Sequence, residues 1–156
     1  PSSPRRQRQM CIRDRPLLSM ITSPSDFELK ISSKPENICL IEPYLDKVRE
    51  EHNINEDLYF NMLLVLTEAV NNSIFHGNAR NPRKNVNISM QRRQQKLCFF
   101  ITDEGSGFDP KKLPDPTAPM QIEQPNGRGV FLMRQLSDYV SYYDNGRKVE
   151  IQFTLQ

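Results

Sequence analysis

Hydrophobic and polar residues alternate along several stretches of the chain, and each such stretch predicts a half-buried β-strand. Two of these strands are joined by a turn near Gln94, and the last two by Asp144-Asn145-Gly146, so both pairs are typical of β-hairpins. The expected strands lie at about residues 27–31, 86–90, 97–101, 139–143 and 148–155.

Apolar residues three or four positions apart predict helices over about 36–52, 56–76 and 129–136. Asn55 is a suitable N-cap for the middle helix, and Gly77 ends it. The order of strand, helix, helix, hairpin, long loop, helix and hairpin predicts an α+β fold. We expect a two-layer α/β sandwich whose mostly antiparallel mixed sheet carries helices on one face.

The chain has 156 residues, which fits one domain, and no stretch approaches the roughly 20 apolar residues of a membrane span. No apolar segment follows the N-terminal arginines, so a secretory signal is not expected. The three widely spaced cysteines do not form the pattern of a disulfide framework or a CxxC metal clip. This cysteine usage fits a reducing compartment, and we expect a cytoplasmic protein without a membrane partner.

Residues 1–25 are rich in proline and serine and predict a disordered tail. They hold five of the 21 basic side chains and one of the 19 acidic ones, so the rest of the chain is slightly acidic. A basic arm for nucleic acid is one interpretation, but the body lacks a basic face and we expect no nucleic-acid partner. We favour an idle tail or a non-native one, because its sequence resembles translated sequencing-adaptor read-through.

Three groups of residues could carry chemistry. Glu68, Asn72 and His76 are spaced by four, so they share one face of the predicted helix. A carboxylate and an amide in this arrangement can take a proton and ligate a hard cation such as Mg²⁺. On spacing alone, however, a solvated polar stripe is the commoner explanation.

The other two groups are rich in glycine. Asp103-Glu104-Gly105-Ser106-Gly107 follows a strongly apolar strand, where an Asp can point into a pocket and glycines allow close approach of a ligand. Asn126-Gly127-Arg128-Gly129 opens a helix, which is a ready anion site. Each motif by itself is weak, because a simple turn would explain the first and helix starts after glycine are common.

In this order, separated by a long proline-rich loop, the three groups resemble the N box, G1 box, ATP lid and G2 box of the GHKL ATPases, which have the Bergerat fold. The stretch Leu66–Gly77 is most similar to the anti-sigma factor serine/threonine kinases of bacterial partner-switching systems. The resemblance covers about residues 26–155. It implies a single ATP-binding kinase domain over 26–156, with an ATP lid at about 108–126.

The resemblance implies how a nucleotide would bind. Asp103 would accept a hydrogen bond from the exocyclic amine of adenine, and guanine would be rejected because it presents a carbonyl oxygen there. Gly105 and Gly107 would line the adenine and ribose. Gly127 and Gly129 would offer backbone N–H groups to the phosphates.

The resemblance also implies the catalytic residues. Glu68 would be the general base and Asn72 the ligand of Mg²⁺, so the cofactors would be ATP and Mg²⁺. Arg128 could contact a terminal phosphate or be solvated. Asn71 and His76 receive no catalytic role. One departure is plain, since the family usually has Gly-Thr before the last strand and this chain has Gly146-Arg147.

The function that we expect is a protein serine/threonine kinase that acts as an anti-sigma factor. Its partners would be a STAS-domain anti-anti-sigma protein, as substrate, and a sigma factor or another output protein. Dimers are common in the resembled family, so a homodimer is also an expectation. One alternative is a catalytically silent, ATP-gated binding switch. A histidine-kinase-like ATPase fragment is disfavoured, because the sequence has two histidines and no helical hairpin upstream.

Overall fold

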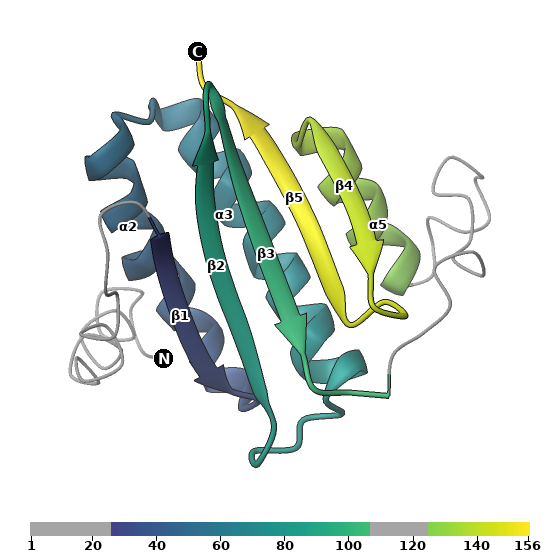
Figure 1. The fold of residues 1–156 in the computed structure, drawn as a ribbon. Helices are drawn as coiled ribbons and strands as arrows, with labels where there is room; N and C mark the ends of the chain where they lie inside the picture. Colours follow the sequence, from purple (N-terminus) through teal and green to yellow (C-terminus); the bar gives the residue numbers. More distant parts are fainter. Residues whose placement is uncertain (1–25, 107–124) are drawn as a thin grey trace, which may run out of the picture.

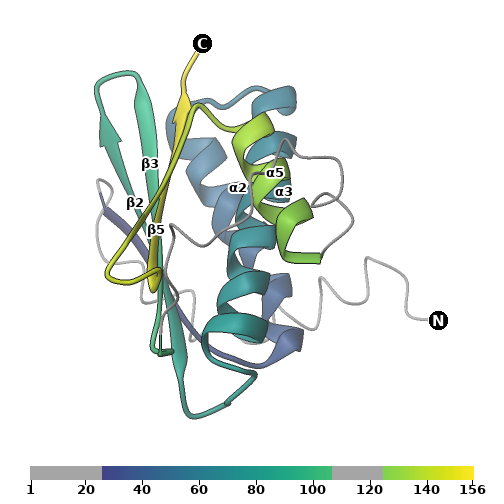
Figure 2. The same ribbon diagram turned by 90° about the vertical axis from the view of Figure 1, so that its right-hand side faces the viewer.

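The structure is a computed structural model that describes residues 26–106 and 125–156. The predicted tail at 1–25 lies outside these ranges, and so does most of the predicted lid at 108–126. Within the described ranges, a five-stranded sheet carries helices on one face, as Figure 1 shows from the sheet side and Figure 2 shows edge-on. The predicted two-layer α+β fold is therefore confirmed.

The strands are arranged in the order β1-β2-β3-β5-β4, and every neighbouring pair is antiparallel. They are β1 (Asp26–Ser32), β2 (Asn85–Arg93), β3 (Lys96–Asp103), β4 (Tyr139–Tyr143) and β5 (Lys148–Thr154). Both predicted hairpins are present, as β2 with β3 and as β4 with β5. The expectation of a mixed sheet is not met within the described residues, since none of these pairs is parallel.

Rows of apolar side chains cross the sheet beneath the helices. Leu29 pairs with Ile88, and Ile88 pairs with Ile101, and all three are buried. Because side chains alternate between the two faces of a strand, the residue two positions beyond Ile101 faces the helices as well. That residue is Asp103, which pairs with Val86. A carboxylate thus occupies the last core-facing position of β3.

The helical layer has three parts. They are α2 (Ile41–His52) after a short 3-10 segment η2 (Pro35–Leu40), α3 (Glu56–Asn72) continued by a π-helical turn η3 (Ser73–Gly77), and α5 (Pro125–Leu136). In Figure 1, α3 lies between α2 and α5, and it packs against both. Among the helices that the structure describes, none is long and apolar enough to cross a membrane.

Two helix predictions are wrong at their starts. The helix expected over 36–52 is split, because Pro43 has no N–H and its ring blocks the carbonyl four residues earlier. The α-helix therefore begins at Ile41, with Pro43 in its first turn. The helix expected from Gly129 begins four residues earlier at Pro125. Proline suits the first helical position, where its missing N–H is not needed.

The predicted cap of α3 gives a test of stability. Asn55 Oδ1 accepts a hydrogen bond from the Leu58 N–H at 2.8 Å. We expect Asn55→Ala to lower the free energy of unfolding by about 1 kcal/mol, measured by urea denaturation. Asn55→Asp keeps the acceptor and should retain most of the stability. An equal loss in both variants would contradict the capping role.

Candidate active site

The carboxylate of Asp103 is buried at the end of β3, and 7% of the residue is exposed. Its Oδ1 accepts a hydrogen bond from the Gly105 N–H at 2.9 Å. Among the described residues nothing donates to Oδ2, which leaves this oxygen available as an acceptor. Burial raises the pKa of Asp103, whereas the Gly105 hydrogen bond and the positive charges of Arg147 and Lys84 lower it.

Two glycines make the space that this carboxylate occupies. A Cβ atom added at Gly77 would lie 2.5 Å from Cγ of Asp103, and one added at Gly105 would lie 2.5 Å from the carbonyl carbon of Gly77. Both distances are far inside van der Waals contact. The end of η3 and the turn after β3 therefore touch through their backbones. The sequence predicts Gly77 only as the end of a helix, so its place against Asp103 is new.

Asn78 connects this junction to the sheet, and sequence reasoning missed it. Its Nδ2 donates to Oγ of Ser33 at 2.7 Å and to the carbonyl of Asn85 at 2.9 Å. Its Oδ1 accepts from the N–H of Glu104 at 2.8 Å. The Glu104 carboxylate in turn accepts a hydrogen bond from the Asn85 N–H. The sequence shows only an Asn directly after a helix-ending glycine, and its partners Ser33, Asn85 and Glu104 are distant along the chain.

The carboxylate of Glu68 lies half-buried on α3, and among the described residues it makes no hydrogen bond. A Cβ added at Gly129 would lie 2.9 Å from Cδ of Glu68, so α5 approaches this carboxylate closely. Burial raises the pKa of Glu68, and the charge of His76 opposes the rise. Burial also raises the pKa of Tyr142 to about 12, with a smaller contribution from the negative charge of Glu68. Glu68 is thus a partly desolvated carboxylate without a hydrogen-bond donor among the described residues.

The residues one turn beyond Glu68 on α3 are polar. Asn72 is one turn further along α3 and half-buried, and no described residue hydrogen-bonds to its amide. The next member of the predicted stripe, His76, is exposed and lies in the π-helical turn. Asn71 has a buried Oδ1 without a hydrogen-bond partner among the described residues. Glu68 and Asn72 therefore lie one turn apart on α3, as their spacing predicts, and neither side chain has a hydrogen-bond partner among the described residues.

The remaining predicted site residues are placed less completely. Gly107 lies outside the described residues, and Gly127 and Arg128 are described only as part of the α5 backbone. Gly127 is in the first turn, where backbone N–H groups have no intrahelical acceptor. Gly129 lies one residue beyond that turn, and its missing side chain gives room to Glu68.

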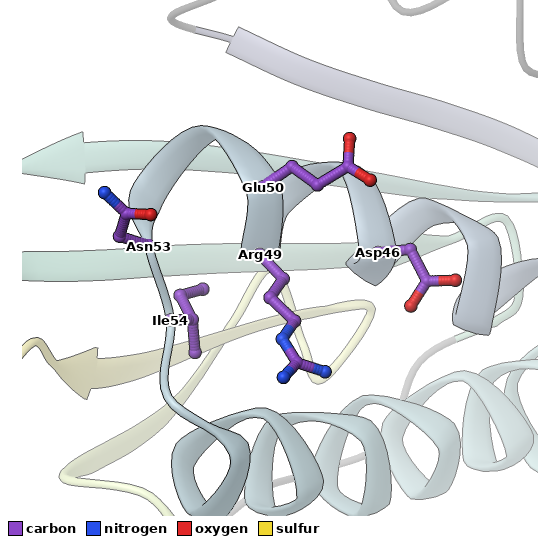
Figure 3. A pocket seen from close by; sticks show the side chains of 5 residues that line it. All are labelled: Asp46, Arg49, Glu50, Asn53 and Ile54. Carbon is purple, nitrogen blue, oxygen red and sulfur yellow. The ribbon is translucent and has the colours of Figure 1, made fainter.

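A surface cavity of about 520 Å³ lies apart from these residues, beside α2 and the loop that leads to α3 (Figure 3). Two of its polar side chains, Asp46 and Arg49, contact Tyr59. The hydroxyl of Tyr59 donates to Asp46 at 2.6 Å, and the guanidinium of Arg49 lies 4.9 Å from the centre of the Tyr59 ring. None of the predicted site residues lines this cavity, which is lined by Asp46, Arg49, Glu50, Asn53 and Ile54.

The glycine contacts predict different costs for two alanine substitutions. In Gly77→Ala the new methyl group meets the end of the Asp103 side chain, which can rotate away. In Gly105→Ala it meets the backbone of Gly77, which cannot. We expect Gly105→Ala to lower the free energy of unfolding by about 2–3 kcal/mol and Gly77→Ala by about 1 kcal/mol, measured by urea denaturation. The reverse order would contradict the described packing.

Comparison with known proteins identifies a family for this architecture. Residues 31–154 match the family described as the histidine kinase-like ATPase domain. The match begins in β1 and ends at the last residue of β5, so it includes Glu68, Asn72, Asp103 and the glycines around them.

Named relatives are similar at modest identity. The serine-protein kinase RsbW of Oceanobacillus iheyensis is 26% identical over 119 residues, which cover 72% of this chain and 75% of the relative. RsbW of Bacillus subtilis is 24% identical over 147 residues, which cover 83% and 92%. The serine/threonine-protein kinase BtrW of Bordetella bronchiseptica is 26% identical over 87 residues, which cover 54% and 61%. The expected resemblance to GHKL ATPases of the anti-sigma kinase branch is confirmed, and the chain belongs to the histidine kinase-like ATPase domain family.

Proposed function

We propose that this protein is an ATP-dependent protein serine/threonine kinase that acts as an anti-sigma regulatory factor. The observation that carries the proposal is the half-buried Glu68 carboxylate, free of hydrogen bonds within the described residues and one helical turn before the free amide of Asn72. Membership of the ATPase family and the kinase names of the relatives support the same conclusion.

Adenine would bind at the end of β3. The free Oδ2 of buried Asp103 is an acceptor suited to the exocyclic amine of adenine. At the corresponding place guanine presents a carbonyl oxygen, and two acceptors facing each other repel. Gly105, whose N–H orients the carboxylate, and Gly107 would line the adenine and ribose side.

The phosphates and Mg²⁺ would lie near Asn72 and the start of α5. Mg²⁺ takes few protein ligands and keeps waters and phosphate oxygens, so one amide oxygen is a chemically adequate protein ligand. The described residues contain no cluster of three His, Cys, Asp or Glu side chains that could hold a metal. A single amide ligand from Asn72 fits a Mg²⁺ ion that arrives bound to the nucleotide. Gly127 would contribute a backbone N–H group from the first turn of α5, Gly129 would leave room beside Glu68, and Arg128 would contribute positive charge.

Glu68 would act as the general base. The oxygen of a serine or threonine hydroxyl forms a bond to the γ-phosphorus of ATP, and the bond from that phosphorus to the bridging oxygen breaks, so that ADP leaves. Glu68 takes the proton that the hydroxyl loses. A base of raised pKa is better matched to this proton transfer than an ordinary surface glutamate. Mg²⁺ supplies charge compensation for the phosphates.

The substrate that we propose is a hydroxyl of a STAS-domain anti-anti-sigma protein, and a sigma factor or another output protein is the alternative partner of the same domain. The family resemblance is the ground for proposing these partners and a homodimer, and the cysteine usage is the ground for proposing a cytoplasmic location. A catalytically silent, ATP-gated switch would keep ATP binding and partner binding but would transfer no phosphate.

The role of Glu68 is tested with Glu68→Gln. We expect this variant to bind ATP as the wild type does and to lose transfer of labelled γ-phosphate by about 10²–10⁴-fold. The acceptor in the assay is a STAS-domain protein from the same genome. Glu51→Gln, an exposed position on α2, is the matched control and should transfer normally. Normal transfer by Glu68→Gln would remove Glu68 as base, and no transfer by the wild type would favour the silent switch.

The transfer rate should also depend on pH through Glu68. The base must be ionised, and burial raises its pKa. On acidification, the transfer rate should therefore begin to fall at a higher pH than it would if the base were an unperturbed glutamate. An acid limb in the ordinary range of an exposed glutamate would contradict this assignment.

The role of Asp103 is tested with Asp103→Asn. Asparagine has nearly the same shape and keeps an oxygen for the Gly105 N–H, so folding should be retained. We expect ATP affinity to fall by about 10–100-fold, because a charged acceptor is lost. The preference for ATP over GTP should narrow, since an amide can donate to the guanine carbonyl. Calorimetric titration with both nucleotides measures this, and unchanged ATP affinity would exclude Asp103 from adenine binding.

A further inference from the structure

Arg147 lies directly across the sheet from Asp103. It is the last residue of the turn between β4 and β5, and its carbonyl accepts the N–H of Asp103 at 2.9 Å. This bond extends the pairing of β3 with β5 by one residue beyond Thr102 and Lys148. Neighbours paired in this way carry their side chains on the same face of a sheet. Arg147 therefore projects to the side on which Asp103 is buried.

The guanidinium of Arg147 holds the turn that follows β3. Its Nε donates to the carbonyl of Gly105 at 2.8 Å, and its Nη2 donates to the carbonyl of Ser106 at 3.3 Å. Its Nη1 forms an ion pair with Asp144 at 3.4 Å, within its own turn. The planar fork of arginine is suited to binding two adjacent carbonyl oxygens at once, and lysine lacks this geometry.

The turn after β3 is thus fixed from two sides. Asn78 holds the N–H of Glu104 from the helical side, and Arg147 holds the next two carbonyls from the side of β5. The N–H of Gly105, which orients the Asp103 carboxylate, lies between these two attachments. The orientation of the carboxylate depends on this turn keeping its shape.

We propose that Arg147 is a positioning residue for adenine recognition, which fixes the Gly105–Ser106 backbone and thereby orients the Asp103 carboxylate. The inference rests on the proposed function, because it takes Asp103 as the adenine acceptor. At this position the resembled family usually has threonine, so the arrangement belongs to this chain's own sequence. Arg147 touches the turn and acts through Asp103.

The charge of Arg147 gives a second readout. The charged groups that act on Asp103 are Arg147 beside β5 and Lys84 before β2. The Glu104 carboxylate is engaged by the Asn85 N–H, η3 presents the Gly77 backbone, and β2 presents the apolar Val86. Loss of the Arg147 charge should raise the pKa of Asp103. Adenine binding requires the ionised carboxylate, so binding should then be lost at a higher pH as the solution is acidified.

The test compares wild type, Arg147→Gln and Arg147→Lys by calorimetric titration with ATP·Mg²⁺ and with ADP·Mg²⁺ between pH 5 and 8. We expect Arg147→Gln to weaken both nucleotides equally, by about 10-fold at pH 7.5, and to move the acid limb to higher pH. Arg147→Lys keeps the charge, so its acid limb should stay in place while its affinity is intermediate. Protonation of the nucleotide is common to all variants and cancels in the comparison.

Two further measurements separate the possible failures. Arg93→Gln removes an arginine that pairs with Glu150 at 3.4 Å, away from the site, and should match the wild type in both titrations. Amide hydrogen exchange of the nucleotide-free protein should be faster at residues 104–106 in Arg147→Gln, which tests the attachment without any ligand.

The outcomes are distinct. Wild-type affinity, pH profile and exchange in Arg147→Gln would overturn the inference and leave the proposed function standing. A loss for ATP without a loss for ADP would assign Arg147 to the terminal phosphate and would also overturn it. Absence of ATP binding by the wild type would overturn the proposed function, and the adenine role of Arg147 with it, whatever the exchange result.

Discussion

The buried contact between the Asp103 carboxylate and the backbone of Gly77 is the constraint on which the candidate site depends. Asp103 continues the alternation of Ile101 on the core-facing side of β3, so its side chain must enter the layer between sheet and helices. A carboxylate is tolerated there because Gly77 leaves it room and Gly105 donates a hydrogen bond. The end of η3 is consequently held against the end of β3.

This contact also sets the position of the proposed catalytic residues along α3. The helix is continuous from Glu56 to Asn72 and then joins η3, so fixing Gly77 fixes where Glu68 and Asn72 lie over the sheet. The opposite face of α3 is buried in the core, which prevents rotation about the helix axis. Gly129 of α5 closes the remaining side by packing against Glu68. The same packing that folds the domain therefore desolvates the proposed base.

Much of this arrangement could be predicted from local patterns. The alternation of apolar and polar residues predicted the strands, and Asn55 as N-cap predicted the start of α3. The four-residue spacing predicted that Glu68 and Asn72 share one helical face. The contacts that orient Asp103 could not be predicted, because they join residues that are distant in sequence. Asn78 reaches Ser33 across 45 positions, and Arg147 reaches Gly105 across 42. A periodic pattern does not predict which carbonyl a side chain will contact. The need for a glycine at position 129 is likewise evident only in the structure, where Glu68 lies beside it.

The two proposed functional carboxylates, Glu68 and Asp103, share one energetic property. Burial raises the pKa of each, so the folded state favours their protonated forms relative to the unfolded chain. The stability that this preference contributes is present at low pH and is lost as the pH rises through the folded pKa values. The charged form of each group is therefore held at a cost to folding. Hydrogen bonding by Gly105 and the charges of Arg147 and Lys84 reduce that cost at Asp103, whereas Glu68 has the charge of His76 and no hydrogen bond among the described residues.

This difference matches the roles that we assign to the two carboxylates. Glu68, which is less compensated, is assigned to proton transfer, and Asp103, which is better compensated, is assigned to binding. Both groups must be ionised to act, but a base becomes more reactive when it is desolvated, whereas an acceptor must also be fixed in place.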